Sequence, residues 1–186
     1  PGQPPTLRIV PKSAEANVIF PFINYAISDR FALVALAPLI KKKNVLETFQ
    51  GSNPNVSLGT FEVNTNGLGD IKFGALYKAY NSADRNHNVI IDAVLSAPTG
   101  SITDEDTQLT PANTRVKARL PYGMQLGSGT WDAVVGTAYW GKHRKWGWGV
   151  QYLATIPLQS DNDEGWRYGD KHELTTWLSY AWEPEL

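Results

Sequence analysis

The sequence predicts an all-β protein, an antiparallel up-and-down transmembrane β-barrel to which this chain contributes about seven strands. Three observations support this fold class. Apolar residues alternate with polar ones in most apolar segments, which is the period of a β-strand. The connections between these segments are short and long in turn, and aromatic residues gather near the ends of the segments. Strands of about 9–11 residues joined in this way are typical of membrane barrels.

The strands are expected near residues 14–25, 30–41, 68–80, 88–98, 131–142, 146–158 and 171–182 of one incomplete barrel domain that spans residues 1–186. The alternation is cleanest from Trp146 to Leu158, where every even position is apolar. The segment from Phe31 to Ile40 is apolar on both faces. It ends at three lysines and is far shorter than the roughly 18 residues that a membrane-spanning helix needs.

The connections divide into two groups. Those of residues 26–29, 81–88 and 141–145 are short and rich in Asn, Asp, Ser and Gly, as turns are. The connections of residues 43–67, 99–130 and 159–169 are long and polar. In an outer-membrane barrel, the short turns face the periplasm and the long loops face the outside. A soluble sandwich has no physical reason to sort its loops in this way.

Aromatic residues near the short turns would form one interfacial girdle of the barrel. These residues are Tyr77, Tyr80, Tyr139, Trp140, Trp146, Trp148, Tyr180 and Trp182. Trp131, Trp166 and Tyr168 lie toward the long loops and would contribute to the opposite girdle. The alternative is a soluble β-protein, in which the same aromatic side chains fill the core.

The polar faces of the strands would point away from lipid. The candidates to line the lumen are Asp70, Lys72, Lys78, Asp92, Asp132, Gln151 and Glu173. They either pair with one another in a structural network or line a permeation path. Arg119, Arg167 and Asp170, which stand where long loops rejoin strands, are candidates for the extracellular mouth or for salt bridges at the loop bases.

A barrel in lipid must close, and bacterial single-chain barrels have an even number of strands. Seven strands do not meet this condition. We therefore expect further strands of the same protein beyond this chain.

Composition excludes several other classes. The net charge of −1 removes the basic signature of a nucleic-acid binder, and the absence of cysteine removes disulfide scaffolds and thiol chemistry. The three histidines are far apart, and the acidic loops lack the spacing of an EF-hand, so no metal site is expected. No catalytic motif such as G-x-S-x-G or H-E-x-x-H is present. We expect no enzyme and no cofactor.

An ordered series of motifs resembles one family. These motifs are Gly67–Asp70, Pro98–Ser101, Leu120–Gly129 with Thr130–Asp132, and Tyr168–Asp170, and the resemblance runs from about Ala14 to Trp182. The family is the outer-membrane proteins called "MetA-pathway of phenol degradation", also labelled transporter, which are distantly akin to the long-chain fatty-acid channels. The resemblance implies a Gram-negative outer-membrane barrel that conducts small hydrophobic or aromatic compounds.

The expected function is therefore passive passage of small hydrophobic or aromatic solutes across the cell outer membrane, with the lipid bilayer as the main partner. Two alternatives stay open. The first is a plugged barrel with a structural or partner-binding role, favoured if the lumen charges are fully paired. The second is a soluble β-sandwich that binds a ligand through exposed tryptophans, favoured if the protein behaves well without detergent.

Overall fold

The computed structural model describes residues 8–182. Within them the chain forms two compact units. Unit 1 comprises residues 8–20, 38–69 and 99–127, and unit 2 comprises residues 21–37, 70–98 and 128–182. The sequence predicted one domain, whereas the chain passes back and forth between these two units.

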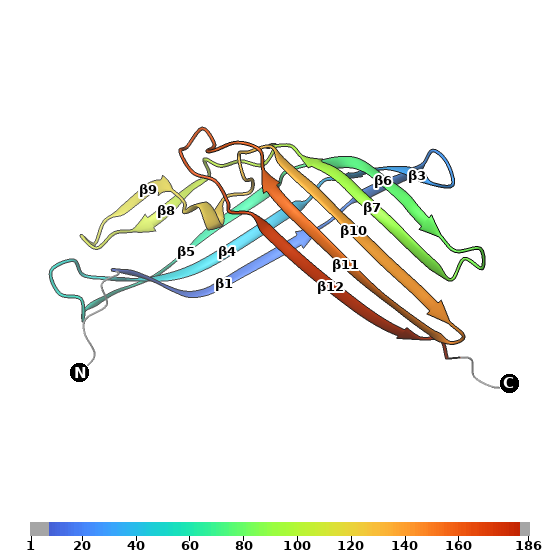
Figure 1. The fold of residues 1–186 in the computed structure, drawn as a ribbon. Coiled ribbons are helices and arrows are strands. Elements are labelled where there is room, and N and C mark those ends of the chain that lie inside the picture. The colour runs from blue at the N-terminus through green and yellow to red at the C-terminus, as the bar shows by residue number, and fades with distance from the viewer. Residues whose placement is uncertain (1–7, 183–186) are drawn as a thin grey trace. The chain divides into compact units, whose positions relative to one another are not determined.

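Unit 2 is a single antiparallel sheet of seven strands. Its strands are β2 (Phe22–Ala26), β3 (Phe31–Leu36), β6 (Lys72–Asn81), β7 (His87–Ser96), β10 (Asp132–His143), β11 (Trp146–Pro157) and β12 (Lys171–Tyr180). Figure 1 shows β7, β10, β11 and β12 running side by side. Their order across the sheet is their order along the chain, which is the up-and-down topology expected. Each of the seven predicted segments supplies one of these strands. Among residues 8–182, the sheet is open, with β2 and β12 at its edges.

Three short turns connect neighbouring strands of unit 2, at residues 27–30, 82–86 and 144–145. In the first, the hydroxyl of Ser28 accepts hydrogen bonds from the backbone N–H groups of Arg30 and Phe31, at 3.3 and 3.1 Å. Arg85 and Arg144 adopt the left-handed conformation in the other two, with φ of 57° and 53°. The prediction of short, polar turns at these places is confirmed.

Unit 1 holds strands in two segments that the sequence predicted to be long loops, residues 43–67 and 99–130, and this prediction was wrong. A three-stranded sheet consists of β1 (Ile9–Ile19), β4 (Leu39–Phe49) and β5 (Ser57–Leu68), and a hairpin consists of β8 (Glu105–Leu109) and β9 (Arg115–Arg119). The pattern was missed because Thr48 and Thr65 are buried in this sheet while its other face carries lysine and glutamate. Polar residues on both faces hide the period of two.

Two prolines explain why the predicted strands 14–25 and 30–41 each divide. Pro21 separates β1 from β2, and Pro38 separates β3 from β4. Proline has no N–H group to donate to a sheet, so it interrupts the ladder. The carbonyls of both prolines still accept hydrogen bonds, from Ala37 N at 3.1 Å and from Gly69 N at 2.8 Å.

The core of unit 1 lies between β5 and the segment that contains the hairpin. It is formed by Phe61, Val63, Leu109, Leu120 and Met124. Met124 ends the three-residue 3-10 turn Tyr122–Met124, the one helical segment in residues 8–182. No helix within those residues is long and apolar enough to cross a membrane.

Candidate functional site: the two faces of the seven-stranded sheet

One face of the unit 2 sheet, here called the apolar face, is nearly free of charged side chains. Residues directly opposite each other in an antiparallel ladder share a face, and the register therefore assigns each side chain. The large side chains of this face are Ile23, Tyr25, Phe31, Leu33, Phe73, Tyr77, Tyr80, Val89, Ile91, Leu95, Val135, Tyr139, Trp146, Trp148, Val150, Tyr152, Ile156, Leu174, Leu178 and Tyr180. The apolar face runs without a break across all seven strands.

None of these large side chains is buried. Leu174, Leu178 and Ile23 are 71%, 69% and 70% exposed, and they stand near the two edges of the sheet. Even in the central strand β7, Ile91 is 45% exposed. Soluble monomers rarely expose an apolar area of this extent, so the apolar face is a surface made to be covered.

Six of the eight aromatic residues predicted for the first girdle lie on the apolar face toward the three short turns. At the last turn, the rings of Trp146 and Tyr180 are 4.9 Å apart. Farther from the turn, the hydroxyl of Tyr139 lies 2.8 Å from Nδ1 of His87. The ring of His87 also contacts the ring of Trp148 edge-on. These rings combine an apolar body with a polar group, as side chains at a membrane interface do.

Of the other two girdle predictions, the one for Trp140 differs from the structure, whereas the one for Trp182 stays a prediction. Trp140 lies opposite Asn88 and Gly149 on the second face of the sheet, because it follows Tyr139 directly and successive strand residues point to opposite faces. Trp182 lies beyond the end of β12 and is 80% exposed.

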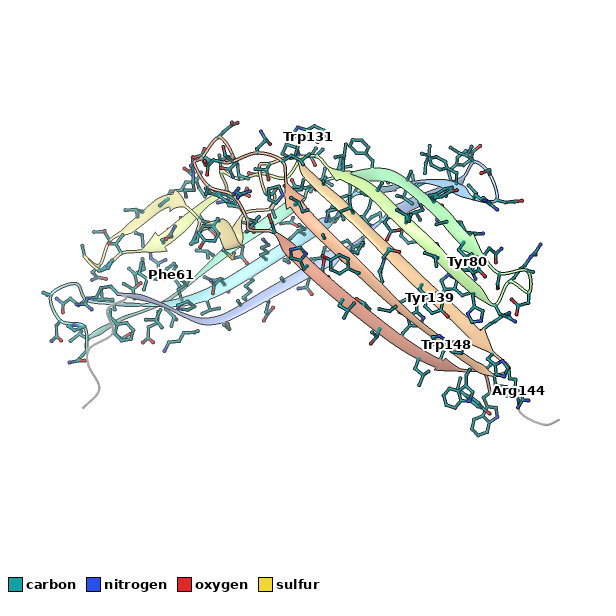
Figure 2. All side chains as sticks on the ribbon, in the orientation of Figure 1. Phe61, Tyr80, Trp131, Tyr139, Arg144 and Trp148 are labelled. Atoms are coloured by element: carbon teal, nitrogen blue, oxygen red, sulfur yellow. The ribbon has the colours of Figure 1, made fainter. Side chains whose placement is uncertain are left out.

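Aromatic residues also stand at the opposite end of the apolar face. Trp131 directly precedes β10 and meets Phe73 edge to face, with ring centroids 6.4 Å apart, and Trp166 meets Tyr168 in the same way at 5.2 Å. Figure 2 shows Trp131 and Arg144 at opposite ends of β10, with Tyr139 between them. From Trp131 to His143 a strand spans roughly 40 Å. At the tilt of about 40° found in barrels this projects to roughly 30 Å, close to the hydrocarbon thickness of a bilayer.

The second face of the sheet carries the charged and polar residues predicted to line a lumen. Lys72, Lys78, Asp92, Asp132, Gln151 and Glu173 all share it by register. Apolar residues such as Leu76, Val94 and Leu153 share it too. The second face is therefore mixed in character, whereas the sequence alternation suggested a polar wall.

Polar contacts join neighbouring strands and residues on the second face. The side-chain amide of Gln151 donates to a carboxylate oxygen of Asp92 at 3.3 Å, and Lys171 forms an ion pair with Glu173 at 3.0 Å. No carboxylate within residues 8–182 forms an ion pair with Lys72 or Lys78. The charges of the second face are thus paired only in part.

Asp70 and Asp132 belong to a hydrogen-bonded network at the end of the sheet away from the short turns. The backbone N–H of Ser128 donates to Asp70 at 2.7 Å, and the hydroxyl of Thr130 donates to Asp132 at 2.6 Å. Asn162, which is buried, donates from Nδ2 to the carbonyl of Ser128 at 2.9 Å. This network ties the connection between β11 and β12 to the start of β10.

The three mouth candidates are divided between the two units. Arg119 is the last residue of β9 in unit 1, whereas Arg167 and Asp170 belong to the connection between β11 and β12 in unit 2. That they ring one extracellular mouth stays a prediction from their loop positions in the sequence. The position of a loop along the sequence does not show to which of the two units the loop belongs.

The charged groups of unit 1 serve its own stability. Lys42 donates from Nζ to the carbonyls of Gln125 and Gly123, at 2.6 and 3.0 Å, and burial lowers the pKa of this lysine. Lys43 pairs with Glu62 at 2.6 Å, and their mutual hydrogen bond raises the pKa of Lys43 and lowers that of Glu62. These contacts hold the segment before residue 127 and the neighbouring strands β4 and β5 together.

Sequence reasoning missed two residues that the structure brings to the second face. Trp177 lies opposite Gly149, and Asn88 lies opposite Trp140. The sequence could have placed Trp177 on this face, because its residue number in β12 is odd, like those of Glu173 and Thr175, and alternate residues of a strand share a face. For Asn88, only the pairing of β7 with β10 shows that it is buried beside a tryptophan.

Within residues 8–182, no group of three or more His, Asp or Glu side chains comes together that could hold a metal ion. The chemistry of the site therefore lies in its two faces, one uniformly apolar and one mixed. A scan against protein-family models finds no match for this chain, and a search of curated proteins finds no relative.

Proposed function

We propose that this chain is part of a β-barrel channel of a Gram-negative outer membrane, through which small hydrophobic or aromatic solutes pass passively. The observation that carries the proposal is the apolar face of the seven-stranded sheet, with its exposed large side chains and its aromatic residues at both ends. The span from Trp131 to His143, projected at the tilt found in barrels, is roughly 30 Å, which is close to the hydrocarbon thickness of a bilayer.

The energetics favour lipid over water next to the apolar face. Removing one large apolar side chain from water is worth about 1.5–3 kcal/mol, and some twenty such side chains share this face. A soluble sandwich would cover the face with a second sheet. Unit 2 holds a single sheet among residues 21–182, so lipid is the simplest cover.

The resemblance of the motifs between Ala14 and Trp182 to the "MetA-pathway of phenol degradation" family supports the same location and the same class of solute. The up-and-down order of the strands agrees with that architecture. In lipid, the free edges of β2 and β12 would leave backbone groups without partners, so the barrel needs further strands to close.

In this channel the second face of the sheet lines the lumen. Its apolar residues, such as Leu76 and Leu153, contact the body of a solute, while Lys72 and Gln151 keep water in the passage. Movement follows the concentration gradient and uses neither a cofactor nor an energy source.

The test is the electrical conductance, in a planar lipid bilayer, of the full-length protein to which this chain belongs. Discrete steps are expected, and Asp92→Asn should shift ion selectivity toward anions while Lys72→Gln shifts it toward cations, because each removes one lumen charge. Glu62→Gln, which changes a carboxylate of unit 1 that pairs with Lys43, is the matched control and should leave selectivity unchanged.

Three results would contradict the proposal in different ways. A protein that inserts as a heat-modifiable barrel but never conducts would favour a plugged barrel. Conductance whose selectivity responds to Glu62→Gln and not to Asp92→Asn would place the passage elsewhere. A protein that stays folded and monodisperse in water without detergent would overturn the membrane location itself.

A further inference from the structure

A pocket of about 230 Å³, here called the turn pocket, lies on the second face of the sheet beside the first short turn. The turn contributes Ser28, Asp29 and Arg30 to its lining, and strands β2, β3, β6 and β7 of unit 2 contribute the rest. A cavity of about 150 Å³ already holds a molecule of six carbon atoms such as benzene. The turn pocket therefore has room for a small organic molecule.

The strands give the turn pocket an apolar wall. Ala26 of β2 lies opposite Ala32 of β3, which lies opposite Leu76 of β6. Directly opposite residues share a face, and Leu76 shares the second face with Asp92. Ile90 of β7 also lines the pocket. Because alanine fills little of the space above the sheet, this part of the pocket offers an open hydrocarbon surface.

Two cationic side chains meet at the edge of the turn pocket. Arg30 directly precedes β3, and its carbonyl accepts a hydrogen bond from the backbone N–H of Lys78 in β6 at 2.8 Å. This bond continues the register Phe31–Tyr77 by one step, so Arg30 lies opposite Lys78 and both side chains belong to the second face. Like charges directly opposite each other are unfavourable. An anion between the two side chains would remove this repulsion.

The charges of the turn pocket leave an excess of one positive charge. Asp29 is the single carboxylate among the lining residues, against the two cations Arg30 and Lys78. None of the three forms an ion pair within residues 8–182. The local field therefore favours a ligand with one negative charge.

Hydrogen-bond donors are also available in the turn pocket. The hydroxyl oxygen of Ser28 accepts from the backbone of Arg30 and Phe31, and no acceptor in the described part of the chain takes the hydroxyl hydrogen. The side-chain amide of Asn24, which lines the pocket from β2, likewise donates to no group of residues 8–182. Both groups could donate to a carboxylate, which accepts several hydrogen bonds.

We propose that the turn pocket binds a small organic carboxylate with a short hydrocarbon body. The carboxylate lies between Arg30 and Lys78 and accepts from the hydroxyl of Ser28. The hydrocarbon body lies against Ala26, Ala32 and Leu76. This inference rests on the proposed function, in which the second face lines the lumen, and it places a solute-selective step at the end of the passage nearest the short turns.

The test is saturation-transfer NMR on the full-length protein to which this chain belongs, in detergent micelles, with three water-soluble probes. Butyrate has the charge and the hydrocarbon body, butyramide has the body without the charge, and acetate has the charge with two fewer methylene groups. Saturable binding is expected for butyrate, and at least about tenfold weaker binding for each of the other two. Equal binding of butyramide would overturn the role of the two cations, and equal binding of acetate would overturn that of the apolar wall.

Variants assign the binding to these residues. Arg30→Gln and Lys78→Gln should each weaken butyrate binding about tenfold, because each removes one of the two cations. Both variants remove a repulsion between like charges, so they should fold at least as well as the unchanged protein. Arg85→Gln, which makes the same change in the exposed turn between β6 and β7, is the matched control and should bind butyrate normally.

A third variant fills the turn pocket without changing its charge. Ala32→Leu places a larger side chain on the apolar wall and should abolish saturable butyrate binding. Ala133→Leu, the same substitution on the apolar face of the sheet, should leave it unchanged. Butyrate binding that persists in Ala32→Leu, or in both Arg30→Gln and Lys78→Gln, would overturn the assignment to this pocket.

The binding and conductance experiments separate the two proposals. Conductance with charge-dependent selectivity but without saturable butyrate binding would overturn the turn pocket as a binding site and leave the channel. Butyrate binding that depends on Arg30 and Lys78 in a protein that never conducts would overturn the channel and leave the binding site.

Discussion

The indole of Trp177 packs directly on the backbone of Gly149, its opposite residue in the neighbouring strand. This contact exists only because residue 149 has no side chain. It links β11 to β12, the edge strand in which every residue is exposed, and it sets the position of one of the two indoles on the second face.

Replacement of Gly149 by alanine should destabilise the protein by about 1–3 kcal/mol, because the new methyl group forces the Trp177 ring away from its place. The measurement is urea unfolding in lipid vesicles, followed by tryptophan fluorescence. Gly169→Ala is the control, since nothing lies within 4 Å of a Cβ at that position. A Gly149→Ala protein as stable as the control would show that the ring moves freely.

Asn162 should be the most important side chain of the connection between β11 and β12. It donates to the carbonyl of Ser128 at 2.9 Å and accepts from the backbone of Glu164 at 3.0 Å and of Trp166 at 3.3 Å. Asn162→Ala should cost about 1–3 kcal/mol and speed proteolysis within residues 158–170, because buried backbone groups lose their partners. Asn66→Ala, at an exposed position of β5, should change neither property.

The turn between β6 and β7 should depend on pH only under acidic conditions. Hydrogen bonds from the Ser82 hydroxyl, then from the backbone and side chain of Asn86, lower the pKa of Asp84 from 3.8 to about 2. Since the folded state has the lower pKa, the stabilisation is complete above pH 3.8 and is lost as the pH falls toward about 2. Carbon-13 NMR of the labelled carboxyl group checks this directly.

Ser82→Ala should move the pKa of Asp84 back toward 3.8, because the hydroxyl that donates to the carboxylate at 2.5 Å is gone. If Asp84 in the unchanged chain titrates at 3.8, the hydrogen bonds of this turn do not form in solution.

Two alanines test the assignment of the faces. Ala93 lies on the apolar face and Ala138 on the second face, and the chain has no cysteine, so each cysteine variant carries a single thiol. In vesicles, Ala138→Cys should react with a charged methanethiosulfonate reagent faster by on the order of tenfold, because the reactive thiolate forms in water and not in lipid. Ala93→Cys should instead transfer a bimane signal to brominated lipid chains. The opposite result would exchange the two faces.

Much of unit 2 could be predicted from the sequence. A period of two is a local property, and segments such as Trp146–Leu158 display it within one strand. The short turns could also be predicted, because Asn, Asp, Ser and Gly favour turns through contacts within a few residues. Unit 1 could not be predicted in this way, since β4 and β5 bury threonines and expose lysines, and their strand character depends on pairing with each other.

The candidate site, too, could be predicted from the sequence only in part. The membership of Lys72, Asp92 and Glu173 in one face followed from alternation along each strand, whereas Trp140 was assigned to the wrong face because proximity to a turn was given more weight than alternation. The meeting of Asn88, Trp140 and Trp177 was invisible, because these residues are far apart in the chain.

By itself the sequence determined the strand periodicity, the turn positions and the uneven distribution of charge between the two sides of each strand. Only the tertiary structure decided which strands pair and in which register. The physical reason is that alternation acts between neighbours in the chain, while register is set by backbone hydrogen bonds and side-chain packing between segments separated by tens of residues. A shift of one residue between β11 and β12 would take Trp177 away from Gly149 and place it on the other face.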